Sequence, residues 1–155
     1  MKKLIVISIL ALSGLPVFAL SCTWTGGAGN GLWADAANWD CGQIPTAMDD
    51  VTLNGIDVIS LSADITIQSL SQFNGTLQGD FDITIEDAYS IFGGTIATNG
   101  SFSIGGAFLW RGGTLGGSGT IACNGFTTLA GSSKNVSGRT VQLNQGADWT
   151  GGNLF

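Results

Sequence analysis

The chain has 155 residues, of which 10% are charged, 25 are glycine and none is histidine, and its formal net charge is −6. The lack of histidine excludes His-based catalytic triads and the most common metal ligand. The acidic balance argues against a nucleic-acid partner, because phosphate binding needs clustered Lys and Arg.

The N-terminus is predicted to be a secretory signal peptide over residues 1–21. A basic start at Met1–Lys3 is followed by an apolar run over Leu4–Leu12, and the small residues Ala19 and Ser21 suit a cleavage site. The apolar run is too short for a membrane-spanning helix, which needs roughly 20 residues. Cleavage after Ala19 and cleavage after Ser21 both fit the pattern. We therefore expect a secreted or cell-surface protein with no transmembrane segment in the mature chain.

An alternative fate for the same leader is lipoprotein processing, with Cys22 as the lipidated first residue. The match is poor, because Ala19 stands three residues before Cys22, where Leu is usual. On either route Lys2 and Lys3 leave the chain. The mature part then has three basic and eleven acidic residues, a net charge of −8.

Residues 22–53 form a segment that is rich in tryptophan and differs from the rest of the chain. Cys22 and Cys41 bracket its first half. Export makes a disulfide between them chemically permissible. Such a bridge closes a loop of about 20 residues, which would stabilise the fold by about 3 kcal/mol through lost chain entropy in the unfolded state.

Residues 54–155 consist of a repeat of about 19 residues. The phrase Trp110–Leu115 recurs at Trp149–Leu154, and a related copy stands at Ile91–Ile96. Apolar residues alternate with polar ones inside each unit, which predicts strands rather than helices. The phrases end at equivalent apolar residues spaced 19, 19, 21 and 18 apart: Leu77, Ile96, Leu115, Val136 and Leu154.

A unit of three short strands cannot bury its own apolar face, whereas stacked units bury a continuous column. The predicted fold is therefore all-β: a single-stranded parallel β-helix, or β-solenoid, with an N-terminal Trp-rich cap. One predicted column consists of Ile85, Ile104, Cys123 and Leu143, and a second of Tyr89, Phe108, Leu129 and Ala147. The first column makes Cys123 an inward-facing, free thiol that packs as a small hydrophobe.

The cap interpretation of residues 22–53 follows from this fold. The first coil of a solenoid exposes an open strand edge, which other chains can pair with. Trp24, Trp33 and Trp39 offer large apolar area to cover it. The alternative is that the three indoles form an aromatic platform on which carbohydrate stacks.

The cap and the repeat together resemble a family of bacterial proteins. The motifs on which the resemblance rests are Thr-Trp-Thr-Gly at 23–26, Asn-Trp at 38–39, Pro45, Asp-Asp-Val at 49–51, and the repeat phrase at 110–120. They resemble secreted and surface parallel β-helix repeat proteins of bacteria, many of them from Bacteroidetes, which are adhesin-like. The resemblance covers nearly the whole mature chain. It implies the N-terminal part of a longer adhesin-like protein.

The C-terminal unit is expected to be open. The chain stops at Phe155 in mid-coil without a polar capping unit, which favours a fragment, a truncated reading frame or a short member that assembles with a partner. Between Val141 and Trp149 the only ionisable residue is Asp148, so we expect none of the inward charges that blunt exposed edges. The sequence therefore predicts self-association through the open C-terminal coil.

The best candidate for a metal site is acidic. Asp64 and Asp82 precede equivalent strands, so their carboxylates would lie on neighbouring coils about 4.8 Å apart. A Ca²⁺ ion could relieve their repulsion through oxygen ligands; alternatively, both side chains point into water. A further polar column is expected to be structural and consists of Thr76, Thr95, Thr114, Asn135 and Asn153.

No group of residues in the sequence predicts catalysis, so the favoured function is a non-catalytic structural or adhesive β-solenoid. The alternative is a polysaccharide-binding or polysaccharide-cleaving β-helix protein. The expected partners are cell-surface or extracellular glycans or proteins. Apart from Ca²⁺, no cofactor is expected.

Overall fold

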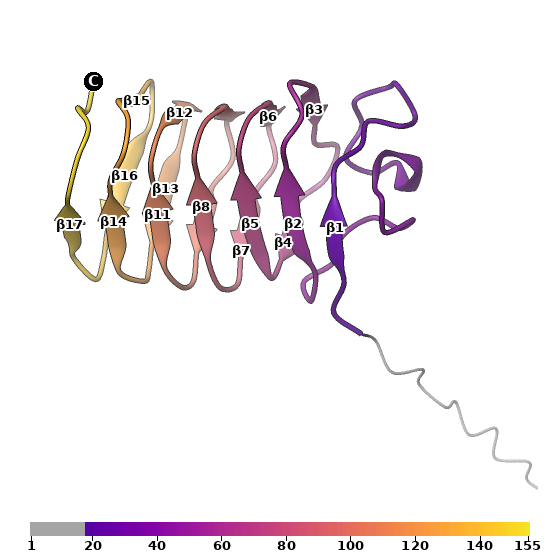
Figure 1. Ribbon diagram of the computed structural model, residues 1–155, viewed down its shortest axis with the longest axis horizontal. Helices are drawn as coiled ribbons and strands as arrows, with labels where there is room; N and C mark the ends of the chain where they lie inside the picture. Colours follow the sequence, from indigo (N-terminus) through magenta and orange to yellow (C-terminus); the bar gives the residue numbers. More distant parts are fainter. Residues whose placement is uncertain (1–17) are drawn as a thin grey trace, which may run out of the picture.

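The computed structural model describes residues 18–155, so most of the predicted signal peptide (1–21) lies outside the described residues. The described chain is all-β apart from one short 3₁₀ helix, η1 (Ala36–Asn38). It winds as a three-sided parallel β-solenoid, with one strand on each side of every coil (Figure 1). The predicted fold class is confirmed.

Three parallel sheets form the sides of the solenoid, and we number them in the order in which the chain enters them. Sheet 1 contains β1 (Ser21–Thr23), β2 (Asp50–Leu53), β5 (Ser69–Gln72), β8 (Tyr89–Ile91), β11 (Phe108–Trp110), β14 (Thr127–Leu129) and β17 (Ala147–Trp149). Sheet 2 contains β3 (Val58–Ser60), β6 (Thr76–Gly79), β9 (Thr95–Thr98), β12 (Gly113–Gly117) and β15 (Lys134–Val136). Sheet 3 contains β4 (Ile65–Ile67), β7 (Ile83–Ile85), β10 (Phe102–Ile104), β13 (Thr120–Cys123) and β16 (Thr140–Leu143).

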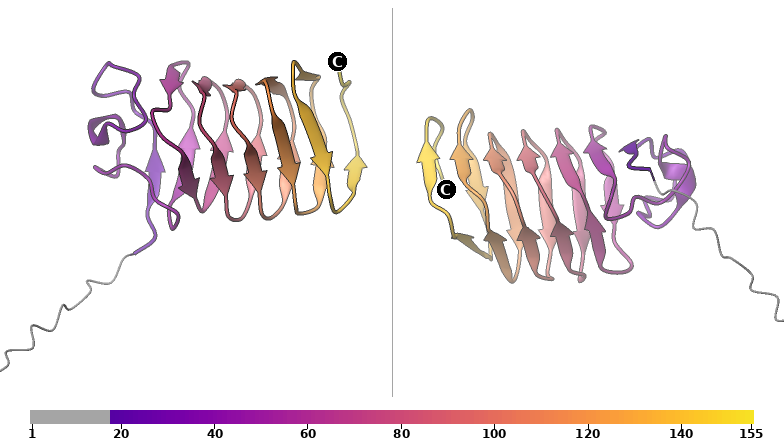
Figure 2. Two further views of the ribbon diagram at one scale, coloured as in Figure 1. Left: turned by 180° about the vertical axis from the view of Figure 1, so that it is seen from behind. Right: turned by 90° about the horizontal axis from the view of Figure 1, so that it is seen from below.

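The register of sheet 3 shows the repeat directly. Ile65, Ile83, Phe102, Ile121 and Val141 lie opposite one another on successive strands, 18 to 20 residues apart. Because each coil pairs in register with the next, equivalent residues stack along the axis of the solenoid, and the views from behind and from below show the same regular stack (Figure 2). The predicted repeat of about 19 residues therefore corresponds to one coil.

The interior is a continuous column of apolar side chains. Ile67, Ile85, Ile104 and Cys123 are fully buried and follow one another in register, as the sequence predicted for the column that holds the free cysteine. Burying one such aliphatic side chain stabilises the fold by about 1.5–3 kcal/mol. The alternation of inward apolar and outward polar residues is thus what turns each repeat into three strands.

Two predicted register positions are wrong. Thr127, not Leu129, lies opposite Phe108, and Leu129 lies opposite Trp110. The prediction sought an apolar residue for an apolar column, whereas a buried threonine occupies that place.

At the last coil Leu154 bridges to Lys134 rather than to Val136. Asn153 accordingly does not continue the column of Thr76, Thr95, Thr114 and Asn135, whose other members do lie in register. Both corrections are shifts of two residues, which leave a side chain on the same face of its strand.

The segment 22–53 lies at one end of the stack, at the indigo end of the colour scale in Figure 1. Its first and last residues belong to β1 and β2, which extend sheet 1, and the loops between them fold over the first coil. Within residues 18–155 no helix is long and apolar enough to cross a membrane.

Candidate functional site

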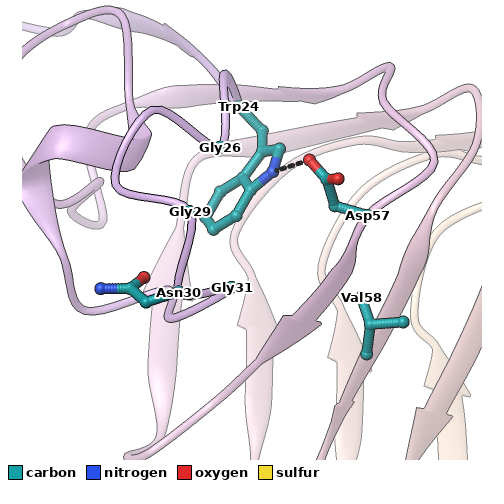
Figure 3. Close-up of a pocket in the computed structure, with 7 residues that line it drawn as sticks. All are labelled: Trp24, Gly26, Gly29, Asn30, Gly31, Asp57 and Val58. Carbon is teal, nitrogen blue, oxygen red and sulfur yellow. Dashed lines mark hydrogen bonds between the residues drawn. The ribbon is translucent and has the colours of Figure 1, made fainter.

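A pocket of about 290 Å³ opens between the cap and the first strand of sheet 2 (Figure 3). Two segments far apart in the sequence form it: the loop that follows Trp24 and the residues that lead into β3. Its lining residues are Trp24, Gly26, Gly29, Asn30, Gly31, Asp57 and Val58. The volume lies at the lower end of the range for small-molecule sites, about 300–1,000 Å³.

One hydrogen bond links the two walls of the pocket. The indole Nε1–H of Trp24 donates to Oδ2 of Asp57 at 2.9 Å (Figure 3). Trp24 is 3% exposed, so its ring forms a fixed wall, whereas Asp57 is exposed. The second carboxylate oxygen of Asp57 is left for another donor, because the hydrogen bond to Trp24 uses only Oδ2.

The three cap tryptophans pack against one another rather than facing solvent. Trp24 and Trp39 meet edge to face with ring centroids 5.1 Å apart, and Trp33 and Trp39 do so at 4.7 Å. All three are at most 3% exposed. None of them therefore offers a free face on which a sugar ring could stack, and the arrangement is that of a cap.

Asn38 holds the loop of the pocket in place. Its side-chain Oδ1 accepts from the backbone N–H of Ala28 at 2.8 Å. Its Nδ2 donates to Oδ1 of Asn30 at 2.8 Å and to the carbonyl of Leu32 at 2.9 Å. Because Asn38 is fully buried, these bonds are shielded from water. The pocket is therefore pre-formed by its supporting contacts.

Two glycines allow the loop to approach the solenoid closely. Gly26 and Gly31 have φ values of +65° and +67°, which non-glycine residues rarely adopt. A Cβ at Gly26 would lie 2.8 Å from Oδ2 of Asp57, and a Cβ at Gly31 would lie 2.7 Å from the carbonyl oxygen of Val58. A side chain at either position would close the pocket.

The chemistry of this pocket suits a small, hydroxyl-rich ligand. It offers one carboxylate beside an apolar ring wall and a glycine-rich backbone. A carboxylate is an acceptor for hydroxyl donors. The site carries a single carboxylate, Asp57, whereas hydrolysis of a glycosidic bond by the common mechanisms uses a pair. The arrangement could bind a hydroxyl-bearing ligand through Asp57.

The structure places the predicted calcium residues, Asp64 and Asp82, on adjacent coils, as the register required. Each carboxylate, however, bonds to the backbone of the next coil: Oδ1 of Asp64 accepts the N–H of Asp82 at 2.9 Å, and Oδ1 of Asp82 accepts the N–H of Ser101 at 2.7 Å. The residues thus form a ladder along the axis. Among residues 18–155, no three His, Cys, Asp or Glu side chains are grouped to hold a metal ion.

The cysteine predictions are confirmed. Cys22 and Cys41 form a disulfide, and Cys123 is free and buried. Burial raises the pKa of the Cys123 thiol to about 11. A thiol in that environment is unreactive, because the thiolate is the nucleophilic form.

The expectation that the last units lack inward charges is wrong. Lys134 is 1% exposed, and its ammonium donates to the carbonyl oxygens of Ala130, Ser132 and Gly151 at 2.5, 2.9 and 3.0 Å. Burial lowers the pKa of this ammonium. The prediction examined only residues 141–149 and missed a lysine at the start of β15.

Arg139 is the second inward cation and is 8% exposed. Its Nη2 group donates to the carbonyls of Thr98, Gly100 and Ser118, so one side chain spans several coils at a corner of the solenoid. Burial lowers the pKa of this guanidinium, with nearby Tyr89 acting in the opposite direction. Backbone carbonyl oxygens accept hydrogen bonds from both cations, whereas Nε and Nη1 of Arg139 are buried without a hydrogen-bond partner. Because the acceptors are backbone groups, no carboxylate in the sequence indicated these inward cations.

The pocket residues were also missed, because Asp57 and Trp24 are 33 residues apart. The available signal was the glycine-rich stretch after Trp24, which predicts a loop that can approach another backbone.

No family model, no curated protein and no solved structure matches this chain.

Proposed function

We propose that the chain is an exported, non-catalytic β-solenoid that serves as a structural and adhesive module at the bacterial cell surface. The in-register stacking of all coils carries this proposal. A parallel stack in which each coil pairs with the next behaves as a stiff, quasi-one-dimensional element. The Cys22–Cys41 disulfide supports export, since such bonds persist in oxidising compartments.

The outward positions of the solenoid fit a surface that contacts partners weakly over a large area. From β2 onward, each strand of sheet 1 has an outward residue between two inward-facing positions, and most of these outward residues carry small hydroxyl side chains: Thr52, Ser71, Ser90, Leu109, Thr128 and Asp148. Hydroxyl groups both donate and accept hydrogen bonds. The proposed partners are therefore extracellular or cell-surface glycans and proteins.

Retention assays on coated beads test this proposal. Beads carrying the mature chain should be retained on layers of bacterial cell-wall polysaccharide or of matrix protein, and beads carrying the reduced and denatured chain should not. The same polysaccharides should yield no new reducing ends after incubation with the chain. Equal retention of native and denatured chain, or the release of reducing ends, would contradict the proposal.

A second candidate function, polysaccharide binding at a defined site, is favoured by the pocket between Trp24 and Asp57. Replacing Asp57 by Asn tests it, since an amide oxygen can still accept the Trp24 N–H while the charge is lost. This change should weaken the binding of mono- and oligosaccharides in titration calorimetry. The matched control is Asp148→Asn at the opposite end of the solenoid, which should leave binding unchanged.

We also propose that the chain self-associates through its last coil, tail to tail with a second copy. The cap covers the other end, so the last coil is the end at which the strand edges of two copies can pair. The apolar residues of the last coil are exposed: Leu143 by 39%, Leu154 by 45%, Trp149 by 52% and Phe155 by 70%. Sedimentation should show a dimer of the wild-type chain and a monomer of the Trp149→Asp variant. A wild-type monomer at tens of micromolar would contradict this proposal.

A further inference from the structure

The backbone of Leu20 is held on both sides by the residues at the start of β2. Its N–H donates to Oδ1 of Asp49 at 2.8 Å. Its carbonyl accepts the N–H of Asp50, also at 2.8 Å. The next residue, Ser21, begins β1 and pairs with Asp50. By contrast, Phe18 and Ala19 have no regular structure and are exposed.

Asp49 is a buried carboxylate whose partners are all neutral. It is fully buried, and besides Leu20 it accepts from the N–H and the hydroxyl of Thr46 at 2.8 Å each, and from Nε2 of Gln43 at 3.4 Å. Neutral donors stabilise an ionised carboxylate, and a cationic donor at hydrogen-bond distance stabilises it further. The nitrogen of Leu20 is the one donor around it that a chemical step can make positive.

We propose that hydrolysis of the Ala19–Leu20 peptide bond is the maturation step of this protein, and that the resulting α-ammonium of Leu20 forms a part-buried ion pair with Asp49. This inference rests on the export that we propose above. The co-reactant is water, delivered by an export endopeptidase. Its oxygen adds to the carbonyl carbon of Ala19, the C–N bond breaks, and the new amine of Leu20 takes up the proton that the new carboxyl group of Ala19 gives up.

The geometry distinguishes cleavage of the Ala19–Leu20 bond from cleavage after Ser21. An ammonium at the Leu20 nitrogen keeps a donor at 2.8 Å from Asp49, and the bond becomes charge-assisted. Cleavage after Ser21 would instead remove Leu20, leave Oδ1 of Asp49 without its donor, and shorten β1. The exposed Phe18 and Ala19 leave the Ala19–Leu20 bond accessible to the protease.

The lipoprotein route is incompatible with the same geometry. Lipidation attaches the lipid to the thiol sulfur of a cysteine at the new N-terminus. The sulfur of Cys22 is already bonded to Cys41, and Cys22 is fully buried.

The first experiment determines the N-terminus of the exported protein by intact mass and N-terminal sequencing. The expected first residue is Leu20. Chains that begin at Cys22 or that carry a lipid would overturn the proposal while leaving export intact. A chain that keeps its leader would instead contradict the proposed export. The two failures are therefore distinguishable.

The second experiment tests the ion pair without relying on export. Residues 20–155 and 19–155 are each released from a removable fusion, so that they differ only in whether the Leu20 nitrogen is an ammonium or an amide. Urea unfolding is measured at about pH 6.5, where an α-amine with a pKa of about 8 is charged. The extension by Ala19 should lower the folding equilibrium constant by about tenfold, because charged hydrogen bonds are roughly twice as strong as neutral ones.

Two carboxylate variants complete this test. In an Asp49→Asn background the extension should have no effect. In an Asp50→Asn background, which changes the exposed neighbour, its effect should remain. Equal stability of the two wild-type chains, or the same extension effect in the Asp49→Asn background, overturns the proposal.

Should Asp49→Asn not fold, acetylation of the Leu20 amine gives an independent readout. In the folded wild-type chain it should be at least about tenfold slower than in the unfolded chain, since the ammonium is held by Asp49. Equal rates overturn the proposal.

Discussion

The two ends of the solenoid differ: the N-terminal end is covered, and the C-terminal end of the described chain is open. At the N-terminal end three tryptophans pack edge to face, and a disulfide ties β1 to the loop that covers the first coil. At the C-terminal end nothing covers β16 and β17 within the described chain, and the inward-facing residues of the last coil are exposed. Two buried cations, Lys134 and Arg139, lie just before this open coil.

Two copies of one sequence phrase show how the position of a coil in the stack affects burial. Trp110 and Trp149 begin copies of the same phrase, and each donates its indole N–H to the carbonyl of a following glycine at 3.0 Å. Trp110 is nevertheless 2% exposed and Trp149 52% exposed. The repeat thus determines the local structure, whereas the next coil determines burial. A tryptophan should therefore contribute much more to the free energy of unfolding at the covered end than at the open end.

The largest expected effect comes from truncating a cap tryptophan. Trp39→Ala removes the ring that contacts both other indoles and should lower the free energy of unfolding by about 3–5 kcal/mol. Its matched control, Trp149→Ala, should cost less than about 1 kcal/mol, because surface changes are usually small. Chemical denaturation of both variants gives the comparison. Equal costs at the two ends would show that the cap does not close the solenoid.

Removing the disulfide should have the next largest effect. Replacing Cys22 and Cys41 by Ser should destabilise the fold by about 3 kcal/mol, since the bridge restricts the unfolded chain. The Cys123→Ala variant is the control. The substitution has its own effect on stability, but reducing agent should lower the stability of this variant by as much as it lowers that of the wild-type chain. A melting temperature of the wild-type chain that does not respond to reducing agent would contradict the role given to this bridge.

A pH effect of about 2 kcal/mol is expected from Asp49, which is the range for hydrogen bonds to charged groups. Burial alone would raise the pKa of this carboxyl, but the hydrogen bonds from Thr46, Leu20 and Gln43 outweigh it, so the pKa is lowered. A lowered carboxyl pKa gives stability that is present above the usual value of 3.8 and is lost as the pH falls through the folded-state value. On acidification, the free energy of unfolding of the Asp49→Asn variant should therefore fall less than that of the wild-type chain. An unchanged acid profile would contradict this assignment.

A smaller loss, about 1–2 kcal/mol, is expected from Lys134→Met, which leaves three carbonyl oxygens near the open end without their donor. Arg111→Met is the control, because Arg111 is exposed and its guanidinium carbon lies 5.8 Å from the centre of the Phe92 ring, with no buried carbonyl to satisfy. Urea unfolding followed by circular dichroism compares the two. Stabilisation by Lys134→Met would contradict a stabilising role for these three hydrogen bonds.

Much of the fold could be predicted because the repeat is local and regular. The column of Ile85, Ile104 and Cys123 follows from alternation and spacing alone, and so does the free cysteine. Positions occupied by an unexpected residue type could not be predicted in this way: Thr127 fills an apolar column, and Lys134 and Arg139 point inward because backbone carbonyls accept from them. The pocket at Asp57 depends on how the cap folds back over β3, which no local pattern encodes.

Hydrogen exchange along the chain tests most directly whether stacking determines burial. It is measured by mass spectrometry at a dilution at which the wild-type protein is monomeric. The amides of β7, β10 and β13, which have a coil on either side, should exchange slowly and at similar rates, and those of β16 and β17 should exchange much faster. Reduction of the disulfide should speed exchange in β1 and β2 first. If β17 were as protected as β11, or if reduction left β1 unchanged, the closed and open ends described here would not exist in solution.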